Sequence, residues 1–391
     1  MARLAPLSPK RMHQGALLLQ NGSMKTISSL ALSAVSVLAA AQSHPSNPVQ
    51  VSGYLDVYYQ HDLARTPHGE TLNGRALDTR NDMLSLAFAE LDFYMPVAPG
   101  RFGFTAMLYA GLGPDIIHLT EPAGKNKYKL IRQGYVTYQT SSKNPVTVDL
   151  GKFDTWVGFE PLDNRTQDQY SRSFNTTYAE PSYDTGLRVS SPLSEKLTGT
   201  VYLVQGWNEV KDSNKSKSWG VALNYAPNSN TSVIVQNHSG TEGSNDSNDQ
   251  GYFGGFGFVT PGTSRVDLYN IVVNHQLGAN TKLGFSADFG SSSKAPNNGK
   301  WNGEVFYIRQ QLSQTKVGSL RFDRFEDKDG LRTGTPVKLY SITGAYDHIF
   351  SPNFTLRFEA RHDLSDNAFF ATHSGFEKHR TTLTLAVIAK F

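Results

Sequence analysis

The sequence contains no cysteine and, after residue 41, no apolar run long enough to cross a bilayer as a helix. The absence of cysteine excludes a disulfide framework, a thiolate zinc site and a cysteine nucleophile. The sequence also lacks a basic surplus, because the formal net charge of +3 comes from residues 1–41, which hold four basic residues and no acid. The remaining chain has 33 basic residues against 34 acidic ones. A balance of this kind gives no electrostatic footprint for nucleic acid.

The mean hydropathy of −0.40 is typical of a soluble protein. A transmembrane β-barrel gives a similar value, because only every second strand residue faces lipid. The first 41 residues read as a leader: Met24 and Lys25 precede an apolar run that ends at the A-x-A site of Ala39 and Ala41. We therefore expect a signal peptide over 1–41, with 1–23 as an upstream extension and 24–41 as the signal proper. The mature domain is expected over 42–391.

The segment 379–391 alternates almost without fault between two faces and ends on Phe391. Leu383 and Leu385 share one face, whereas Arg380, Thr382 and Thr384 share the other, because neighbouring side chains on a strand point to opposite sides. A strand with lipid on one side and water on the other has this pattern. A half-buried strand of a soluble sandwich also has it, so the rest of the chain must decide between the two.

Period-2 segments bounded by Gly, Pro, Asn and Ser predict about sixteen strands, within a range of 14 to 18. Their expected bounds are 51–60, 83–95, 101–111, 128–140, 145–152, 183–191, 196–206, 217–226, 230–237, 264–275, 280–290, 301–313, 315–325, 337–350, 353–362 and 379–391. Every second connection is a tight turn, and the others are longer. This parity favours an all-β, transmembrane antiparallel β-barrel with short periplasmic turns and long extracellular loops. In the second strand, a change of apolar phase predicts a β-bulge near Ala89 and Glu90.

Several motifs between residues 148 and 227 consist of turn and strand residues in a recurrent order. They are Gly151-Lys152-Phe153, Gly158-Phe159-Glu160, Pro181 with Tyr183 to Gly186 and Arg188, and Gln205-Gly206-Trp207-Asn208. Together with Gly53 to Tyr59, this stretch resembles the OmpL-like β-barrel porin family. The resemblance implies a bacterial outer-membrane barrel that conducts solutes, and Phe391 resembles the signal read by the barrel assembly machinery. It implies no particular substrate.

The third long connection, from about 153 to 182, combines aromatic and charged residues and has the ordinal position of a loop that narrows the pore of general porins. We expect this loop to form a pore constriction in which its charges face a basic wall and create a transverse field. The expected constriction residues are Asp154, Glu160, Asp163, Arg165 and Asp168. The expected pore-wall residues are Arg188, Arg321, Arg357, Glu359, Arg361 and Arg380. An outward cap or a plain surface loop is the alternative.

The sequence predicts an outer-membrane porin for passive diffusion of small hydrophilic solutes or ions, without enzyme activity, catalytic residues, metal or cofactor. Its expected partners are outer-membrane lipid and lipopolysaccharide and the barrel assembly machinery, with a homotrimer left open. The alternative is a narrow or plugged barrel that acts as an adhesin or binds a surface ligand. A hydrolase is disfavoured, because neighbours such as His238 and Ser239 on one strand point to opposite faces and cannot act as a pair.

Overall fold

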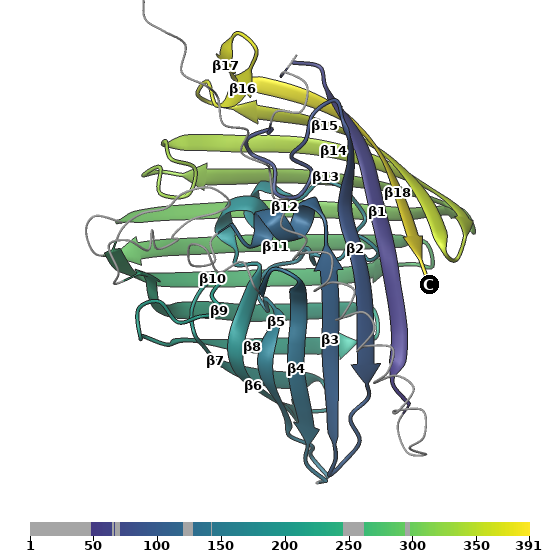
Figure 1. The fold of residues 1–391 in the computed structure, drawn as a ribbon, viewed down its shortest axis with the longest axis vertical. Helices are drawn as coiled ribbons and strands as arrows, with labels where there is room; N and C mark the ends of the chain where they lie inside the picture. Colours follow the sequence, from purple (N-terminus) through teal and green to yellow (C-terminus); the bar gives the residue numbers. More distant parts are fainter. Residues whose placement is uncertain are drawn as a thin grey trace, which may run out of the picture. The chain divides into compact units, whose positions relative to one another are not determined.

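The computed structural model describes residues 48–64, 66, 71–119, 128–141, 143–244, 262–293 and 298–391. The expected signal peptide, 1–41, lies outside these residues. Within the described part, sixteen antiparallel strands close into a barrel in which each strand pairs with its neighbours in the chain (Figure 1). The first strand, β1, pairs with the last, β18, so the sheet leaves no free edge. Closure matters because a barrel satisfies every ladder hydrogen bond internally.

The observed strands agree with the predicted ones within three residues at each end, except that β9 continues seven residues beyond its predicted end at 237. The first eight strands are β1 (Gln50–Asp62), β2 (Leu84–Met95), β3 (Phe102–Ala110), β4 (Ile131–Gln139), β5 (Thr147–Asp154), β6 (Tyr183–Ser194), β7 (Leu197–Val204) and β8 (Ser218–Asn228). The second eight are β9 (Thr231–Ser244), β10 (Gly262–Leu277), β11 (Thr281–Ser293), β12 (Gly299–Ser313), β13 (Lys316–Asp327), β14 (Val337–Ser351), β15 (Phe354–Ser365) and β18 (His379–Lys390).

Short turns and long connections alternate around the barrel. The turns 195–196, 229–230 and 314–315 consist of two residues each, whereas the connection between β5 and β6 runs from 155 to 182. This alternation places the turns at the periplasmic rim and the long loops at the external rim. We number the external loops in chain order, so that the first loop is 63–83, the third loop is 155–182 and the eighth loop is 366–378.

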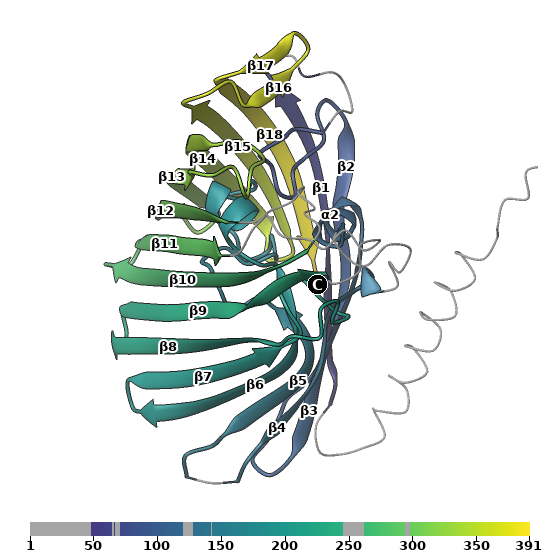
Figure 2. The ribbon, with the colours of Figure 1, turned by 90° about the vertical axis from the view of Figure 1, so that its left-hand side faces the viewer.

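Among the described residues of the external loops, the structure has three small elements, and the sequence periodicity missed all of them. They are the helix α2 (Leu112–Ile117), the π-helical turn η2 (Asn175–Ala179) and the hairpin of β16 (Phe370–Thr372) with β17 (Gly375–Glu377). The turn η2 contacts β11, β12 and β13, and Figures 1 and 2 show it inside the ring of strands. No helix in the described part of the chain is both long enough and apolar enough to cross a bilayer.

The two faces of the strands differ as the alternation predicts. On β13, Arg321, Asp323 and Phe325 are buried toward the interior, whereas Leu320 and Phe322 are exposed on the outside. The closing strand β18 repeats the pattern and presents its leucines outward. The outer surface is therefore apolar and suits lipid, while the interior is mixed and largely polar.

Two irregularities change which side chains reach the interior. The pairing of β1 with β2 shifts between Asp56 and Val57, which leaves Ala87 unpaired. The predicted β-bulge therefore exists, but it lies two residues before Ala89. A second shift, between β3 and β4, leaves Arg132 unpaired. Because a bulge resets the alternation, Glu90 and Arg132 both become buried in the interior.

Candidate functional site

The third loop lies inside the barrel, because its backbone bonds to inward-facing side chains of the wall. The Glu359 carboxylate of β15 accepts the backbone N–H groups of Tyr170 at 2.5 Å and Ser171 at 3.0 Å. The Asp323 carboxylate of β13 accepts the N–H of Phe174 at 2.9 Å. These bonds join segments about 150 residues apart or more, so they fix the course of the loop across the interior.

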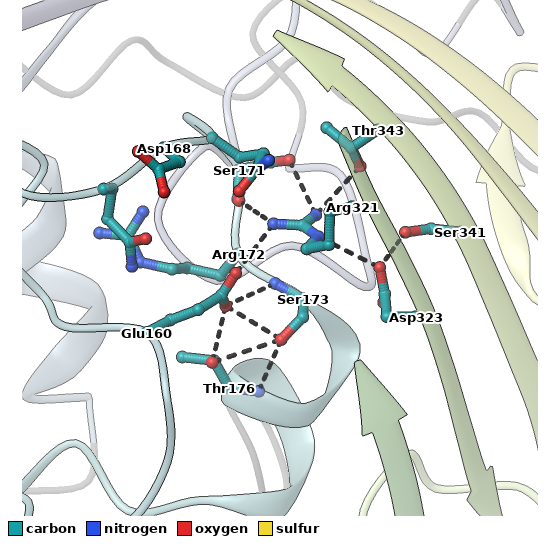
Figure 3. A network of polar contacts seen from close by, with 12 residues as sticks. Glu160, Asp168, Ser171, Arg172, Ser173, Thr176, Arg321, Asp323, Ser341 and Thr343 are labelled. Carbon is teal, nitrogen blue, oxygen red and sulfur yellow. Dashed lines mark hydrogen bonds and ion pairs between the residues drawn. The ribbon is translucent and has the colours of Figure 1, made fainter. Parts of the chain in front are cut away.

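A buried ion pair between Glu160 of the loop and Arg321 of β13 lies at the centre of this attachment (Figure 3). Arg321 Nη1 lies 3.0 Å from Glu160 Oε1 and donates to the carbonyl oxygen of Ser171 at 2.5 Å. Glu160 Oε2 accepts from the N–H of Ser173 at 2.8 Å and from the Thr176 hydroxyl at 2.7 Å. The Glu160 carboxylate thus bonds both to Arg321 of the wall and to Ser173 and Thr176 of the loop.

The surroundings of Glu160 favour its charged form despite complete burial. Burial raises the pKa of this carboxyl, but Arg321, Arg172 and the hydrogen bonds from Thr176 and Ser173 outweigh it and hold the pKa below its usual value. The attachment therefore depends on an ionised Glu160. An ionised carboxylate that lost Arg321 would remain buried without its main cation.

Two other basic wall residues, Arg357 and Arg361, bond to carbonyl groups of the third loop rather than to its carboxylates. Arg357 donates to the carbonyl oxygens of Gln167 at 2.6 Å and Gln169 at 3.1 Å, and Arg361 donates to that of Arg172. Carbonyl oxygens accept two hydrogen bonds each and suit the fork of a guanidinium group. These two arginines therefore hold the backbone of the third loop against β15.

The first loop also enters the interior, which the sequence did not predict. Arg380 of β18 donates to the carbonyl oxygen of Asn73 at 2.5 Å. Arg75 lies 3.0 Å from Asp363 and donates to Thr382 at 2.7 Å. Arg380 thus contacts the first loop rather than the third.

Where the third loop passes β2, β4 and β5, two arginines meet four carboxylates. Arg165 of the loop lies 3.0 Å from Glu90 and 2.7 Å from Asp92, and it also pairs with Asp163 at 2.7 Å. Arg132 lies 2.8 Å from Glu90 and 2.6 Å from Asp154. We call this set of six residues the acidic pole. Its members are Glu90, Asp92, Arg132, Asp154, Asp163 and Arg165, and its formal charge is −2.

Three residues further along the loop, a set of opposite sign lies on the opposite wall. Arg309 of β12 pairs with Asp168 of the loop at 3.1 Å, and Arg357 pairs with Asp347 at 2.6 Å. Lys282 of β11 interacts with Asp168 electrostatically and is exposed. We call these five residues, whose formal charge is +1, the basic pole. Burial raises the pKa of Asp168, and Arg309 opposes that shift.

The expected site residues therefore fall into separate groups. Glu160 with Arg321 forms an attachment, Asp163 and Arg165 lie in the acidic pole, and Asp168 lies in the basic pole. Asp154 is the last residue of β5 rather than a loop residue. Arg188 lies on another part of the wall, where it pairs with Asp149 at 2.6 Å.

Sequence reasoning missed three of the four wall residues of the acidic pole. Glu90 and Asp92 follow the bulge at Ala87, and Arg132 occupies the bulge of β4, so simple alternation misplaces all three. A phase change in β2 was the available signal. That phase change moves Glu90 and Asp92 into the inward-facing set.

The tyrosines of the inner wall pack against the loops. Tyr54, Tyr58, Tyr109 and Tyr307 are almost fully buried. Tyr307 stacks on Phe159 of the third loop with the ring centroids 4.1 Å apart. They therefore stiffen the loop packing, and they do not present open ring faces to a solute.

His238 and Ser239 are neighbours on β9. His238 lies 3.0 Å from Glu242 on the inner side, whereas Ser239 pairs in register with the outward Asp267. The two side chains thus lie on opposite faces, as expected. Within the described ranges, no group of three or more His, Cys, Asp or Glu residues has the arrangement of a metal site.

Comparison with known proteins identifies the fold and the family. Similar solved structures include the anion-selective porin from Comamonas acidovorans, with 11% identity, a TM-score of 0.58, and coverage of 88% of this chain and 100% of that chain. The outer membrane channel DcaP of Acinetobacter baumannii gives 10% identity, a TM-score of 0.57, and coverage of 88% and 98%. The trimer form of OmpT, an outer membrane protein of Vibrio cholerae, gives 6% identity, a TM-score of 0.55, and coverage of 89% and 100%.

At such identities these likenesses establish the fold alone, a porin-type barrel. No curated protein matches the sequence. The family model described as "Putative beta-barrel porin-2, OmpL-like" matches residues 48–391, which spans the whole described part of the chain. Its members are channels rather than enzymes. The chain therefore belongs to the OmpL-like β-barrel porin family and is an outer-membrane porin.

Proposed function

We propose that this porin lets small hydrophilic solutes and ions diffuse passively through its lumen, and that the third loop forms the constriction. The observation that carries the proposal is the position of Asp163 and Arg165 in the acidic pole and of Asp168 in the basic pole. A loop that contacts both walls within a few residues leaves little free width between them. Solutes would be sorted there by size and charge.

The two poles give the constriction a transverse field. The acidic pole belongs to β2, β4 and β5, and the basic pole to β11, β12, β14 and β15; β12, which carries Arg309, is directly across the sixteen-strand ring from β4, which carries Arg132. Arg309, Asp168 and Asp154 keep about a quarter of their side-chain surface exposed. These three groups can meet a passing ion without any rearrangement of the loop.

The periplasmic half of the lumen supports a water-filled path. Inward-facing Arg188, Ser190, Thr198, Thr200 and Asn224 remain half-buried or exposed there. Polar side chains that stay accessible favour water over packed protein. Solutes that pass the constriction would enter this polar chamber.

One observation favours the alternative of a plugged barrel. The external ends of β10, β12, β13 and β14 turn apolar side chains inward, and these pack with Phe174 and Tyr178 of the third loop and with Phe369 and Phe370 of the eighth loop. On that side the external half of the lumen is a dry core. A plugged barrel would make the external loops the functional surface, as in an adhesin or a surface receptor.

Single-channel conductance of the protein extracted from outer membranes and reconstituted in a planar bilayer distinguishes the two functions. A diffusion porin gives stable open steps, whereas a folded barrel without steps supports the plugged alternative. For the constriction itself, the informative variant is Arg309→Gln, which removes one charge from the basic pole. Arg188→Gln is the matched control, because Arg188 is also an inward arginine paired with an aspartate but has no bond to the third loop among those of the described residues.

The size of the expected effect follows from Coulomb's law. The Coulomb interaction between the Arg309 charge and a monovalent ion about 5 Å away is about 0.8 kcal/mol at the dielectric constant of water. Salt screening at 0.1 M reduces it to about 0.5 kcal/mol, and the substitution removes it. Because a cation is favoured and an anion disfavoured by this amount, Arg309→Gln should raise the cation-to-anion permeability ratio about fivefold, as measured by the reversal potential in a salt gradient. An equal change in both variants would rule out a special role of the loop.

We propose further that residues 1–41 direct export and that Phe391 is read by the assembly machinery. A homotrimer is also proposed, because the porin-type barrel of OmpT has a trimer form. Cross-linking in whole cells tests this point. A ladder that stops at one copy would exclude the trimer.

A further inference from the structure

The described part of the first loop fills one side of the external lumen. Residues 71–81 fold into a tight turn that is closed by the bond from the N–H of Leu72 to the carbonyl of Thr79 at 2.8 Å, and we call them the first-loop turn. Ala76 and Leu77 of this turn are buried. They share one apolar cluster with residues of β1, β18 and the third loop, among them Tyr54, Tyr58, Leu162, Tyr170, Ala386 and Ile388. The dry core of the third and eighth loops fills the other side, so apolar packing narrows the external lumen from both sides.

A solute that crosses this lumen needs room that one of the two loops must provide, and the first-loop turn is the more weakly attached. The third loop bonds to the side chains of five wall residues, which are Arg321, Asp323, Arg357, Glu359 and Arg361. The first-loop turn bonds across the lumen through Arg75, which reaches β15 and β18, and through Asn73, which contacts Arg380 and the eighth loop. We therefore expect the first-loop turn to move before the third loop does.

Arg75 is the charged anchor of the turn. Its Nη2 lies 3.0 Å from the Asp363 carboxylate of β15 and donates to the Thr382 hydroxyl of β18 at 2.7 Å. Asp363 keeps a partner without Arg75, because Arg361 Nε lies 2.6 Å from it on the same strand. Loss of Arg75 therefore releases the turn and leaves the wall charge paired.

The charged groups beneath the turn lack hydrogen bonds that water would supply. Nε and Nη1 of Arg75, Nη2 of Arg361 and Nε of Arg380 are buried without a hydrogen-bond partner among the described residues. Neither carboxylate oxygen of Asp78 accepts a hydrogen bond from another described residue, and the nearest part of Arg75 is 3.7 Å away. Buried polar atoms without partners are costly, and movement of the turn would admit water to them. The hydration gained on opening thus offsets part of the bonds that opening breaks.

The turn also has a hinge and free space beside it. It leads into β2 through Asp82, a residue with φ 52° whose carboxylate is held by the outward His61 of β1 at 2.5 Å. A left-handed backbone at a residue other than glycine is typical of switch regions. A cavity of about 750 Å³ lies between the turn and the second, seventh and eighth loops, and the exposed Leu119 and Phe376 are on its lining. A turn that swings about Asp82 can enter this space.

We propose that the first-loop turn is a gate, which closes the external lumen in this structure and opens by swinging outward about Asp82 when the bonds of Arg75 and Asn73 break. The gate and the constriction of the third loop act in series, so that the first controls entry and the second sorts the solutes that enter. This inference rests on the proposed function, because a gate controls passage only through a lumen that conducts.

Thiol labelling measures the opening directly, because the chain contains no cysteine and one introduced thiol gives the whole signal. Ala76→Cys places the thiol in the buried cluster, where a membrane-impermeant maleimide added outside whole cells reaches it only while the gate is open. Ala179→Cys is the matched control, because Ala179 is equally buried in η2 of the third loop. Ala76→Cys should be labelled and Ala179→Cys should not. Labelling at neither position, or at both with the same rate, would overturn the proposal.

Arg75→Gln in the Ala76→Cys background tests the anchor. Removal of one partner of a buried ion pair shifts an equilibrium by at least about a hundredfold, so labelling should accelerate by this factor where opening is a rapid pre-equilibrium. Arg188→Gln in the same background removes an inward arginine that pairs with Asp149 elsewhere on the wall, and it should leave the labelling rate unchanged. An unchanged rate in Arg75→Gln, or equal acceleration in both variants, would contradict the role of Arg75 as the anchor of a gate.

Single-channel recording separates the gate from the proposed function. If both are correct, Arg75→Gln spends a larger fraction of the time in open steps than the wild type does. Faster labelling without open steps in any variant would support the movement of the turn and refute passive diffusion. Faster labelling with open steps of unchanged frequency and duration would overturn the gate, because the turn would then move without closing the lumen. Heat-modified electrophoretic mobility, which reports a closed barrel, confirms that each variant is folded.

Discussion

Replacing Arg321 by Gln should release the third loop from β13. The variant leaves Glu160 fully buried, with hydrogen bonds from Ser173 and Thr176 but without its closest cation. Removal of one partner of a buried ion pair typically costs about 3–5 kcal/mol, because the remaining charge is no longer compensated. The remaining bonds of the loop to Glu359 and Arg361 are expected to keep it in the lumen. We therefore expect a mobile loop and a folded barrel.

The response to pH separates an electrostatic release from a general packing defect. In the wild type the pKa of Glu160 lies below its unfolded value, so its stabilising contribution is present above the unfolded pKa and is lost as the pH falls through the folded one. In Arg321→Gln, burial still raises the pKa of Glu160, but the Arg321 cation no longer lowers it. Acidification then neutralises a destabilising charge. The attachment should weaken with acid in the wild type and strengthen with acid in the variant.

The assay is single-channel recording at several pH values, with open-channel noise as the measure of loop motion. At neutral pH, Arg321→Gln should give noisier and larger open steps than the wild type, and noise should fall on acidification. The double variant Glu160→Gln and Arg321→Gln removes both charges and should restore most of the quiet behaviour, because the polar pair is then uncharged. Arg188→Gln is the control. If Arg321→Gln and the control behave alike at every pH, the attachment by this ion pair is refuted.

Three further predictions concern other parts of the loops and the seam. Gly158 has φ 102°, and a Cβ there would meet the carboxyl group of Glu180, so Gly158→Ala should displace the third loop and lower the melting temperature by a few degrees. Burial raises the pKa of Glu209 to about 8, so stability should fall as the pH rises from about 4.5 to 8, and Glu209→Gln should flatten that part of a thermal-unfolding profile. Phe391→Ala keeps the two backbone bonds to Gly53, so pulse-chase assays should show slower assembly in cells while the melting temperature is unchanged.

The sequence predicts the barrel well because the strands are defined by local patterns. Alternation identifies all sixteen strands, and the parity of connection lengths identifies the external rim. Alternation also assigns Arg321, Arg357 and Arg380 to the interior without any knowledge of contacts. A period of two residues contains that information, because the face of one residue fixes the face of every other residue on the same strand.

The partners of these residues could not be predicted in the same way. The course of the third loop depends on bonds such as those from Tyr170 to Glu359, which connect residues 189 positions apart. No local pattern encodes such a contact. The bulges at Ala87 and Arg132 add a second difficulty, because each one reverses the assignment of the residues that follow it. The acidic pole depends on both kinds of information, and for that reason only Asp154, Asp163 and Arg165 among its six residues were predicted.

The exposure of each inward arginine determines how strongly it acts on a passing ion. Arg321, Arg357 and Arg361 have almost no exposed side-chain surface, and each donates hydrogen bonds to backbone carbonyl oxygens of the third loop. A group that is buried and paired contributes little to the field felt by a passing ion, whereas a partly exposed one contributes directly. Ion selectivity should therefore follow Arg309, Asp168 and Asp154 rather than the larger set of inward arginines. Substitution of a buried arginine should change the mobility of the loop first, and selectivity only as a result of that motion.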